Sequence, residues 1–344
     1  MSTARYEHFI LQNTAPKEAT TIGIYNSNGV RKGTIPLGNL KFPDGIGNKL
    51  YSVGVLSDVH VSSSVDTSES DFRRALTYFQ DVEDVDFVCI AGDLTQYAEA
   101  AEWTLYAKCV SEESENTPVY PIGGNHDAYG SGLSDATFNQ YTGHGTFYTF
   151  TQGDDVFIML SQIAWASQSG NIQPFSTSQL QSLYTALETN RNKRCFVFQH
   201  IFPWGKAGDP FQSYSSNSFW GTQGQVIQSL MEHYKNSIWF HGHSHQMFET
   251  QQFHDGATYD FDFGVHNIHI PSCAKPVYVT DESRTDLIQG SQGYVMDVYN
   301  NAIVLRGRDF SKGDFVPLGI YHLDTTLKTV SAGTFTDSTG TITV

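Results

Sequence analysis

The fold is decided by the stretch YSVGVLSDVH at residues 51–60, an apolar strand that ends in an acid and an imidazole. Apolar residues at helical spacing follow over Asp71–Phe79, and a second apolar strand covers Asp86–Ala91. Strand, helix and strand in this order predict a β-α-β unit with parallel strands.

Further along the chain, helical and strand patterns continue to alternate. Helices are expected at Ala98–Val110, at Gln223–His233 and after the capping box Ser176-Thr177-Ser178-Gln179. Strands are expected at Pro118–Ile122, Thr146–Phe150, Val156–Leu160, Cys195–Gln199 and Ile238–His241. Beyond residue 246 β patterns dominate, including a hairpin of Tyr294–Tyr299 with Ala302–Arg306. We expect an α/β fold, a four-layer α-β-β-α sandwich of two mixed sheets flanked by helices.

The two ends of the chain differ from its centre. Residues 1–46 are polar, and two β-like runs, Thr21–Tyr25 and Arg31–Pro36, flank Asn26-Ser27-Asn28-Gly29, a hairpin signal. This segment is interpreted as an N-terminal β-rich extension or small module. The main domain is expected over residues 47–322, and residues 323–344 form a β-like tail.

Composition excludes several classes of protein. Of 344 residues, 20 are Lys or Arg and 36 are Asp or Glu, and the net charge of −16 argues against a nucleic-acid track. No apolar run approaches the ~20 residues of a membrane span, and no secretion signal is recognisable, so a cytoplasmic protein is expected. The separated Cys89, Cys109, Cys195 and Cys273 predict free, buried thiols.

Acidic, amide and imidazole side chains follow the expected strands at the points where the strands end. They occur at Asp58 with His60, Gly92-Asp93, Gly124-Asn125-His126-Asp127, His200, and Gly242-His243-Ser244-His245. In open α/β sheets, ligands bind at the carboxyl ends of strands, where loops from several strands converge. The five places therefore predict one shared site.

The donor types indicate a metal site. Two Asp, one Asn and four His residues supply hard oxygens and borderline nitrogens, which favours Zn, Mn, Fe or Co over Ca. Seven donors are too many for one tetrahedral ion. If one carboxylate is shared, they form two sites of four protein ligands each and leave positions for water or substrate.

Each motif alone also has a structural interpretation. An Asp-x-His after a strand more often caps a turn, Gly-Asp is ordinary in loops, and Gly-Asn initiates turns. The alternate histidines His243 and His245 are more specific, because two histidines behind a strand are costly to bury without partners. The presence of all five motifs, each behind a strand, disfavours the structural interpretation.

Together the motifs resemble those of the calcineurin-like metallophosphoesterases, hydrolases of phosphate esters with two metal ions. The family pattern is D-x-H, GD, GNH followed by D or E, a lone H, and GHxH, and the five motifs occur here in that order. The resemblance covers about residues 50–310. It implies two divalent or mixed-valence ions, one held by Asp58, His60 and His245, the other by Asn125, His200 and His243.

The resemblance also implies a mechanism. Asp93 would bridge the ions, and a bridging water or hydroxide would attack phosphorus in line. His126 would stabilise the transition state or protonate the departing oxygen. Asp127 would either orient His126 or serve as a structural turn acid. Gln96 stands where purple acid phosphatases of this family have a metal-binding Tyr, so we expect no tyrosinate-iron centre.

Several other residues near the motifs have two interpretations. His241 is expected to be a core histidine, and His144 a surface histidine or a substrate contact. The aromatic runs Phe202–Gly205 and Phe211–Trp220 either line the substrate pocket or pack on themselves, and Tyr129 is a similar candidate for the rim of the site.

The expected function is therefore a phosphodiesterase or broad phosphomonoesterase that acts on small phosphate esters. One alternative is a vestigial or structural module, viral or surface-exposed, with the same fold. Another is a DNA exonuclease of the same family, which the net charge disfavours. Two carboxylates and two divalent ions would leave the site locally positive. The acidity of the chain therefore opposes only long polyanionic substrates.

Overall fold

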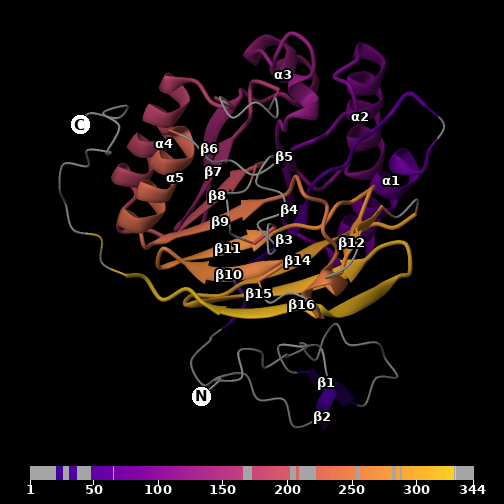
Figure 1. The fold of residues 1–344 in the computed structure, drawn as a ribbon, viewed down its shortest axis with the longest axis vertical. Coiled ribbons are helices and arrows are strands. Elements are labelled where there is room, and N and C mark those ends of the chain that lie inside the picture. Colours follow the sequence, from indigo (N-terminus) through magenta and orange to yellow (C-terminus); the bar gives the residue numbers. More distant parts are fainter. Residues whose placement is uncertain are drawn as a thin grey trace.

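The computed structural model describes residues 21–25, 31–36, 48–64, 66–165, 173–201, 207–208, 222–252, 256–280, 284–286, 289–328 and 330. Two six-stranded sheets face each other (Figure 1). The strand order of the first sheet is β16 (Asp314–Asp324), β15 (Ala302–Asp309), β14 (Gln292–Val298), β3 (Tyr51–Leu56), β4 (Phe87–Ala91) and β5 (Val119–Ile122). That of the second is β10 (Tyr259–Asp262), β11 (Val265–His269), β9 (Ser237–His241), β8 (Cys195–Gln199), β7 (Asp155–Leu160) and β6 (Phe147–Gln152).

Both sheets are mixed. In the first, β3, β4 and β5 are parallel, whereas β14, β15 and β16 form an antiparallel meander on β3. In the second, β7, β8, β9 and β11 are parallel, and the edge strands β6 and β10 are antiparallel. The parallel strands of each sheet bring their carboxyl ends to one edge, and the loops that carry the predicted donors start there.

The main core lies between the sheets. Successive side chains of a strand point to opposite faces, so Val53 and Val55 of β3 face the second sheet whereas Leu56 faces the helices. In β7, Phe157 and Met159 point inward, and Leu160 packs under the helices of the second sheet. Both faces of these strands are thus buried, which explains their continuous apolar runs.

Helices cover the outer face of each sheet (Figure 1). The first sheet carries α1 (Ser68–Tyr78), which continues into the π-helical turn η2 (Phe79–Glu83), together with α2 (Ala100–Glu113) and α3 (Asp135–Thr142). The second sheet carries α4 (Thr177–Thr189) and α5 (Thr222–His233). The four-layer α-β-β-α sandwich expected from the sequence is confirmed, as is the capping box at Ser176.

Three smaller expectations are also met. The strands β1 (Thr21–Tyr25) and β2 (Arg31–Pro36) pair in an antiparallel hairpin, and β14 pairs with β15 as expected. All four cysteines are free and buried. No helix within the described ranges is long and apolar enough to cross a membrane.

The sequence patterns miss several elements, among them α3 and β16. Helix α3 is short, and its signal is mainly the N-cap Ser134, whose side chain accepts a hydrogen bond from the backbone N–H of Thr137. Strand β16 contains Pro317 and Gly319, which usually interrupt strands. Gly319 is required there, because an added Cβ would lie 2.6 Å from the ring of Phe248. The strand ends at Asp324, two residues beyond the predicted end of the main domain.

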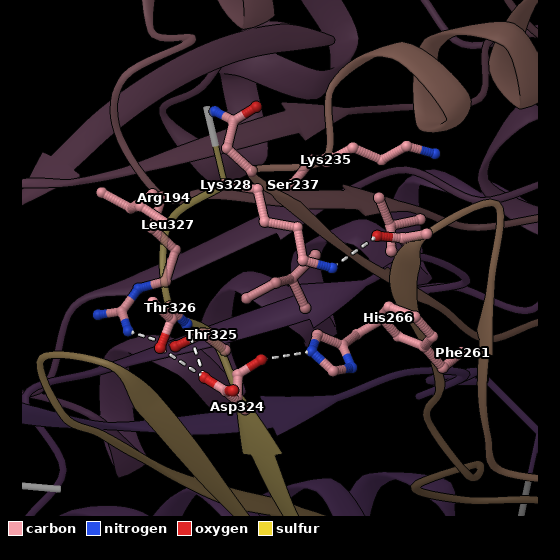
Figure 2. A pocket seen from close by; sticks show the side chains of 14 residues that line it. Arg194, Lys235, Ser237, Phe261, His266, Asp324, Thr325, Thr326, Leu327 and Lys328 are labelled. Carbon is pink, nitrogen blue, oxygen red and sulfur yellow. Dashed lines mark hydrogen bonds between the residues drawn. The ribbon is translucent and has the colours of Figure 1, made fainter. Parts of the chain in front are cut away.

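A buried arginine joins the two sheets at the end opposite the predicted site. The guanidinium of Arg194 donates to both oxygens of Asp155, at 2.9 and 2.5 Å, and to the carbonyl oxygen of Tyr299. Figure 2 shows Arg194 beside Thr325, to whose hydroxyl it donates at 2.8 Å. These bonds tie the connection that follows β16 to the amino end of β8.

A second buried arginine makes the protein sensitive to acid. Burial raises the pKa of Glu83, but the hydrogen bonds and charge of Arg306 outweigh it, so the pKa lies below its ordinary value of 4.5. This carboxylate therefore stabilises the fold above pH 4.5, and the contribution is lost as the pH falls through its folded-state pKa. We expect Glu83→Gln to lower the free energy of unfolding by about 2 kcal/mol at pH 7.

Urea unfolding at pH 7 and at pH 4 checks this expectation. The difference between wild type and Glu83→Gln should shrink at the lower pH, because the carboxylate then takes up a proton in the unfolded chain more readily than in the folded protein. Arg306 also pairs with Asp297 at 2.9 Å, a contact that the substitution does not remove, so the variant should still fold. A difference that stays constant with pH would contradict the assigned ion pair.

Candidate metal centre

The predicted donors meet at the carboxyl edge, between the two sheets. The loops after β3, β4 and β5 of the first sheet carry Asp58, His60, Asp93 and Asn125. The loops after β8 and β9 of the second sheet carry His200, His243 and His245. The donor set thus draws on both sheets, and their packing determines its geometry.

One group of donors comprises Asp58, His60, Asp93 and His245, whose ligand atoms lie within 4.8 Å of one another. The Nε2 atoms of His60 and His245 are 3.0 Å apart, and Nε2 of His245 is 3.1 Å from Oδ1 of Asp58. Nε2 of His60 is 3.6 Å from Oδ2 of Asp93. Ligands about 2.1 Å from a tetrahedral ion lie roughly 3.4 Å apart, so these spacings suit a bound cation.

A second group comprises Asp93, His200 and His243. Nε2 of His200 is 3.1 Å from Oδ2 of Asp93, the same oxygen that faces His60. Asn125 was predicted to belong here, and its side-chain oxygen is buried without a hydrogen-bond partner. Asp93 is the one residue that the two groups share.

Several donors have a backbone that is unusual for their residue type. Asp58, His60, Asp93, His243 and His245 all have a left-handed conformation, with φ between +47° and +73°. Residues other than glycine adopt this backbone conformation at a free-energy cost of roughly 1–2 kcal/mol each. Strain of this kind gathers at functional sites, where surrounding structure enforces it.

The donors are largely in the protonation states that metal binding requires. Burial raises the pKa of Asp58, but the charges of His245 and His200 lower it more, so its pKa lies below the ordinary value. Burial lowers the pKa of His243 to about 3. Asp93 raises the pKa of His200 to about 9 despite its burial, so a metal ion would displace a proton there.

Backbone carbonyl groups hold two of the histidine rings. Nδ1 of His200 donates to the carbonyl oxygen of Ala91 at 2.7 Å, and Nδ1 of His245 donates to that of Lys275 at 2.9 Å. Each bond orients the ring so that Nε2 faces the other donors, the usual arrangement of metal-ligating histidines. Neither carbonyl was identifiable from the sequence, because a carbonyl has no residue-type signal.

His126 lies against the donors but belongs to neither group. Its ring is 4.6 Å from that of His60, and its backbone N–H donates to Oδ1 of Asp93 at 2.8 Å. Its Nδ1 donates to the carbonyl oxygen of Gln96 at 2.7 Å. Nε2 is therefore the ring nitrogen that remains for a substrate.

Asp127 holds the loop together. Its buried carboxylate accepts hydrogen bonds from the backbone N–H groups of Gly124, Leu94 and Thr95 at 2.8–2.9 Å, and from the hydroxyl of Thr95. Burial and the nearby charge of Asp93 raise its pKa to about 6. These bonds favour the structural alternative for Asp127, and the carbonyl of Gln96 orients the ring of His126 instead.

Two glycines of the motifs stand where no larger residue fits. A Cβ on Gly124 would overlap Oδ1 of Asp93, and one on Gly242 would overlap Oγ of Ser57 and Oδ2 of Asp58. The backbone thus approaches the carboxylates more closely than any other residue type allows.

We expect Gly242→Ala to lower metal affinity at least about tenfold, because the new Cβ displaces the carboxylate of Asp58. Metal titration checks the affinity, and urea unfolding should show a loss of about 1–3 kcal/mol from overpacking. Gly145→Ala is the matched control, because its Cβ would meet only ordinary contacts, the nearest at 3.5 Å. Wild-type affinity in Gly242→Ala would contradict the expected displacement.

Other residues singled out in the sequence lie in varied settings. His241 is fully buried at the end of β9, where burial lowers its pKa well below the ordinary value, as expected for a core histidine. His144 is half-buried and stacks on Tyr148 at 4.4 Å, so it is not a plain surface residue. The aromatic runs Phe202–Gly205 and Phe211–Trp220 lie outside the described residues.

Little or no sequence signal marked three residues near the site, namely Tyr97, Trp165 and Lys275. Tyr129, the rim candidate, is exposed, and its ring lies near those of Tyr97 and Trp165. Neither Tyr97 nor Trp165 belongs to one of the five motifs. Lys275, beyond the last motif, contacts the side chain of Gln96 through its ammonium group.

The fold and the clustered donors define an α/β sandwich with a candidate metal-binding site. The chain belongs to the calcineurin-like phosphoesterase family, whose model matches residues 51–247. Among curated protein sequences none matches the chain.

Solved structures show distant likenesses. An uncharacterized Streptococcus pneumoniae protein, described as a predicted phosphoesterase, is 11% identical over 80% of this chain and 97% of its own, with a TM-score of 0.38. Vacuolar protein sorting 29 from Cryptosporidium parvum is 11% identical over 80% and 98%, with a TM-score of 0.37. A protein serine/threonine phosphatase from Saccharomyces cerevisiae is 12% identical over 74% of each chain, with a TM-score of 0.30.

Proposed function

We propose that the protein is a dinuclear-metal-dependent phosphoesterase in which Asp93 bridges the ions. One ion would be held by Asp58, His60 and His245, and the other by Asn125, His200 and His243. The observation that carries the proposal is the position of Oδ2 of Asp93, which lies 3.6 Å from Nε2 of His60 and 3.1 Å from Nε2 of His200. One carboxylate oxygen thus faces donors of both groups.

A buried polar atom supports the presence of a cation. Oδ1 of Asn125 is buried without a hydrogen-bond partner. Leaving such an atom unpaired costs free energy, which coordination to a metal would recover. Membership of a family that usually binds two metal ions agrees with this arrangement.

When bound, such ions lower the pKa of water and neutralise phosphate charge. The residues of this chain would position the ions and the substrate and would stabilise charge or supply a proton. The carboxylates of Asp58 and Asp93 fix the positions of the ions, and the carbonyl of Gln96 holds the ring of His126 through Nδ1. Nε2 of His126 would then stabilise the developing charge or give a proton to the departing oxygen.

We propose small phosphate esters as substrates, either diesters or monoesters. The net charge of −16 repels long polyanions along the surface, whereas a small ester needs to meet only the metal-loaded site. The donor types favour Mn, Fe, Zn or Co as the native metals. Among the described residues nothing favours the structural-module or DNA exonuclease alternatives.

Metal analysis combined with hydrolysis assays tests the proposal. Protein stripped with a chelator should be inactive, and Mn, Fe, Zn or Co should restore hydrolysis of an aryl monoester or an aryl diester. Activity should saturate as the metal content approaches two ions per chain. Two bound ions without hydrolysis of any ester would overturn the proposed activity, and activity that is complete at one ion would overturn the dinuclear centre.

A further inference from the structure

Three exposed aromatic rings gather beside the metal centre. Among the described residues, seven large hydrophobic side chains are exposed, and four of them are aromatic, namely Tyr97, Tyr129, Trp165 and Phe261. The first three lie together and are 48%, 47% and 39% exposed. Exposed apolar groups scattered singly need no explanation, but a cluster at the mouth of a site indicates a binding surface.

The rings form a continuous series that starts at the proposed catalytic histidine. The ring centroid of Trp165 is 5.1 Å from that of His126 and 4.9 Å from that of Tyr129, and Tyr129 is 5.6 Å from Tyr97. All three pairs are edge-to-face, a favourable arrangement for aromatic rings. We call Tyr97, Tyr129 and Trp165 the aromatic platform.

The platform is assembled from loops of both sheets. Tyr97 follows β4 and Tyr129 follows β5, whereas Trp165 follows β7 of the second sheet. The loop of Trp165 is anchored, because the backbone N–H of Ile163 donates to Pro174 and its carbonyl accepts from the N–H of Leu133. The rings are therefore held at the same carboxyl edge as the metal donors.

We propose that the aromatic platform binds a flat aromatic group on the departing alcohol of the substrate, so that the preferred substrates are phosphate esters of aryl-bearing or nucleoside alcohols. This inference rests on the proposed phosphoesterase activity. The phosphate group would lie at the metals and the departing oxygen at His126. The ring of Trp165, 5.1 Å from that of His126, then lies where the carbon skeleton of the alcohol begins.

Charge supports an aromatic rather than an anionic occupant. The platform consists of three uncharged rings, whereas a second phosphate would need a cationic partner there. The ammonium group of Lys275 is engaged with the side chain of Gln96, the residue before Tyr97. Stacking is tolerant of ring type, because every base or aryl group has a π-face.

The reaction balances as a hydrolysis. Water oxygen forms a new bond to phosphorus while the bond from phosphorus to the oxygen of the alcohol breaks. The departing oxygen takes one proton, and the aromatic alcohol leaves with its ring still near the platform. No oxidant or reductant is needed.

Substrate pairs that share the departing oxygen separate ring binding from leaving-group chemistry. Benzyl phosphate is compared with cyclohexylmethyl phosphate, or their symmetrical diesters are compared if only diesters are hydrolysed. AMP is compared with ribose 5-phosphate, in which a hydroxyl group takes the place of the base. The benzyl pair tests whether the protein prefers an aryl group, and the nucleotide pair tests whether it prefers a nucleobase. We expect kcat/KM to favour the aromatic member of at least one pair about tenfold.

Variants assign that preference to the platform. Trp165→Leu and Tyr129→Leu remove an aromatic face but keep apolar bulk, and each should reduce the preference about three- to tenfold. Phe261→Leu is the matched control, because this exposed ring lies in the pocket at the opposite edge (Figure 2). The substitution should leave kcat/KM unchanged for both members of each pair.

The outcomes separate this inference from the proposed activity. Equal kcat/KM for both members of each pair in wild type would overturn the aromatic substrate class while leaving the phosphoesterase intact. An equal loss on both members in Trp165→Leu would mean that Trp165 only supports His126. If no ester is hydrolysed, calorimetry compares the affinities of the metal-loaded protein for AMP and for ribose 5-phosphate. Equal affinities would show that the aromatic platform does not bind the base.

Discussion

Asp93→Ala is expected to lose both metal ions and all measurable phosphoesterase activity. One oxygen of this carboxylate faces His60 and His200, which belong to different donor groups. Its other oxygen accepts the backbone N–H of His126 at 2.8 Å. Removing the side chain therefore leaves two clusters of imidazole nitrogens without the negative charge between them, and metal affinity should fall at both positions.

Metal content per chain after dialysis and hydrolysis of an aryl phosphate measure the two effects. Asp93→Asn separates charge from shape, because an amide oxygen can still accept from His126 but carries no charge. It should lose metal nearly as fully as Asp93→Ala while unfolding more like wild type. Asp154→Ala, an exposed carboxylate in the turn before β7, is the control and should keep both ions. Full metal content in Asp93→Ala would refute the bridging role.

His126→Ala is expected to keep its metals and lose roughly 10²–10⁴ in kcat, the usual contribution of a general acid or base. The side chain of His126 is in neither donor group, and its Nδ1 is occupied by the carbonyl of Gln96. Only Nε2 therefore remains for the reaction. Metal analysis together with kcat measures the prediction, and His322→Ala on β16 is a control histidine remote from the motifs.

The leaving group distinguishes the two roles that remain open for His126. A nitrophenolate departs without protonation, so a general acid should matter little for a nitrophenyl ester and greatly for an alkyl ester. An equal loss on both esters would instead indicate stabilisation of transition-state charge. A metal-free His126→Ala protein would show that His126 is a ligand, contrary to the role proposed here.

The strands and donor positions were predictable because both depend on local patterns. Continuous apolar runs such as Cys195–Gln199 identify strands that are buried on both faces. Donors directly behind such strands meet wherever parallel strands share an edge, so Asp58, Asp93 and His200 could be assigned to one site before its geometry was known. Short elements with weak periodicity, such as α3, were not predicted, because they carry too little local pattern.

Contacts between neighbouring loops and between the two sheets were not predictable, because strand order and sheet packing do not follow from spacing along the chain. The carbonyl of Gln96 orients His126, and Asp127 binds the backbone at Leu94 and Thr95 instead. Trp165 reaches His126 only because β7 and β5 lie in facing sheets. Residue types and local periodicity thus determine which groups can bind metal, whereas strand order and the packing of the two sheets decide what orients those groups and which aromatic rings stand beside them.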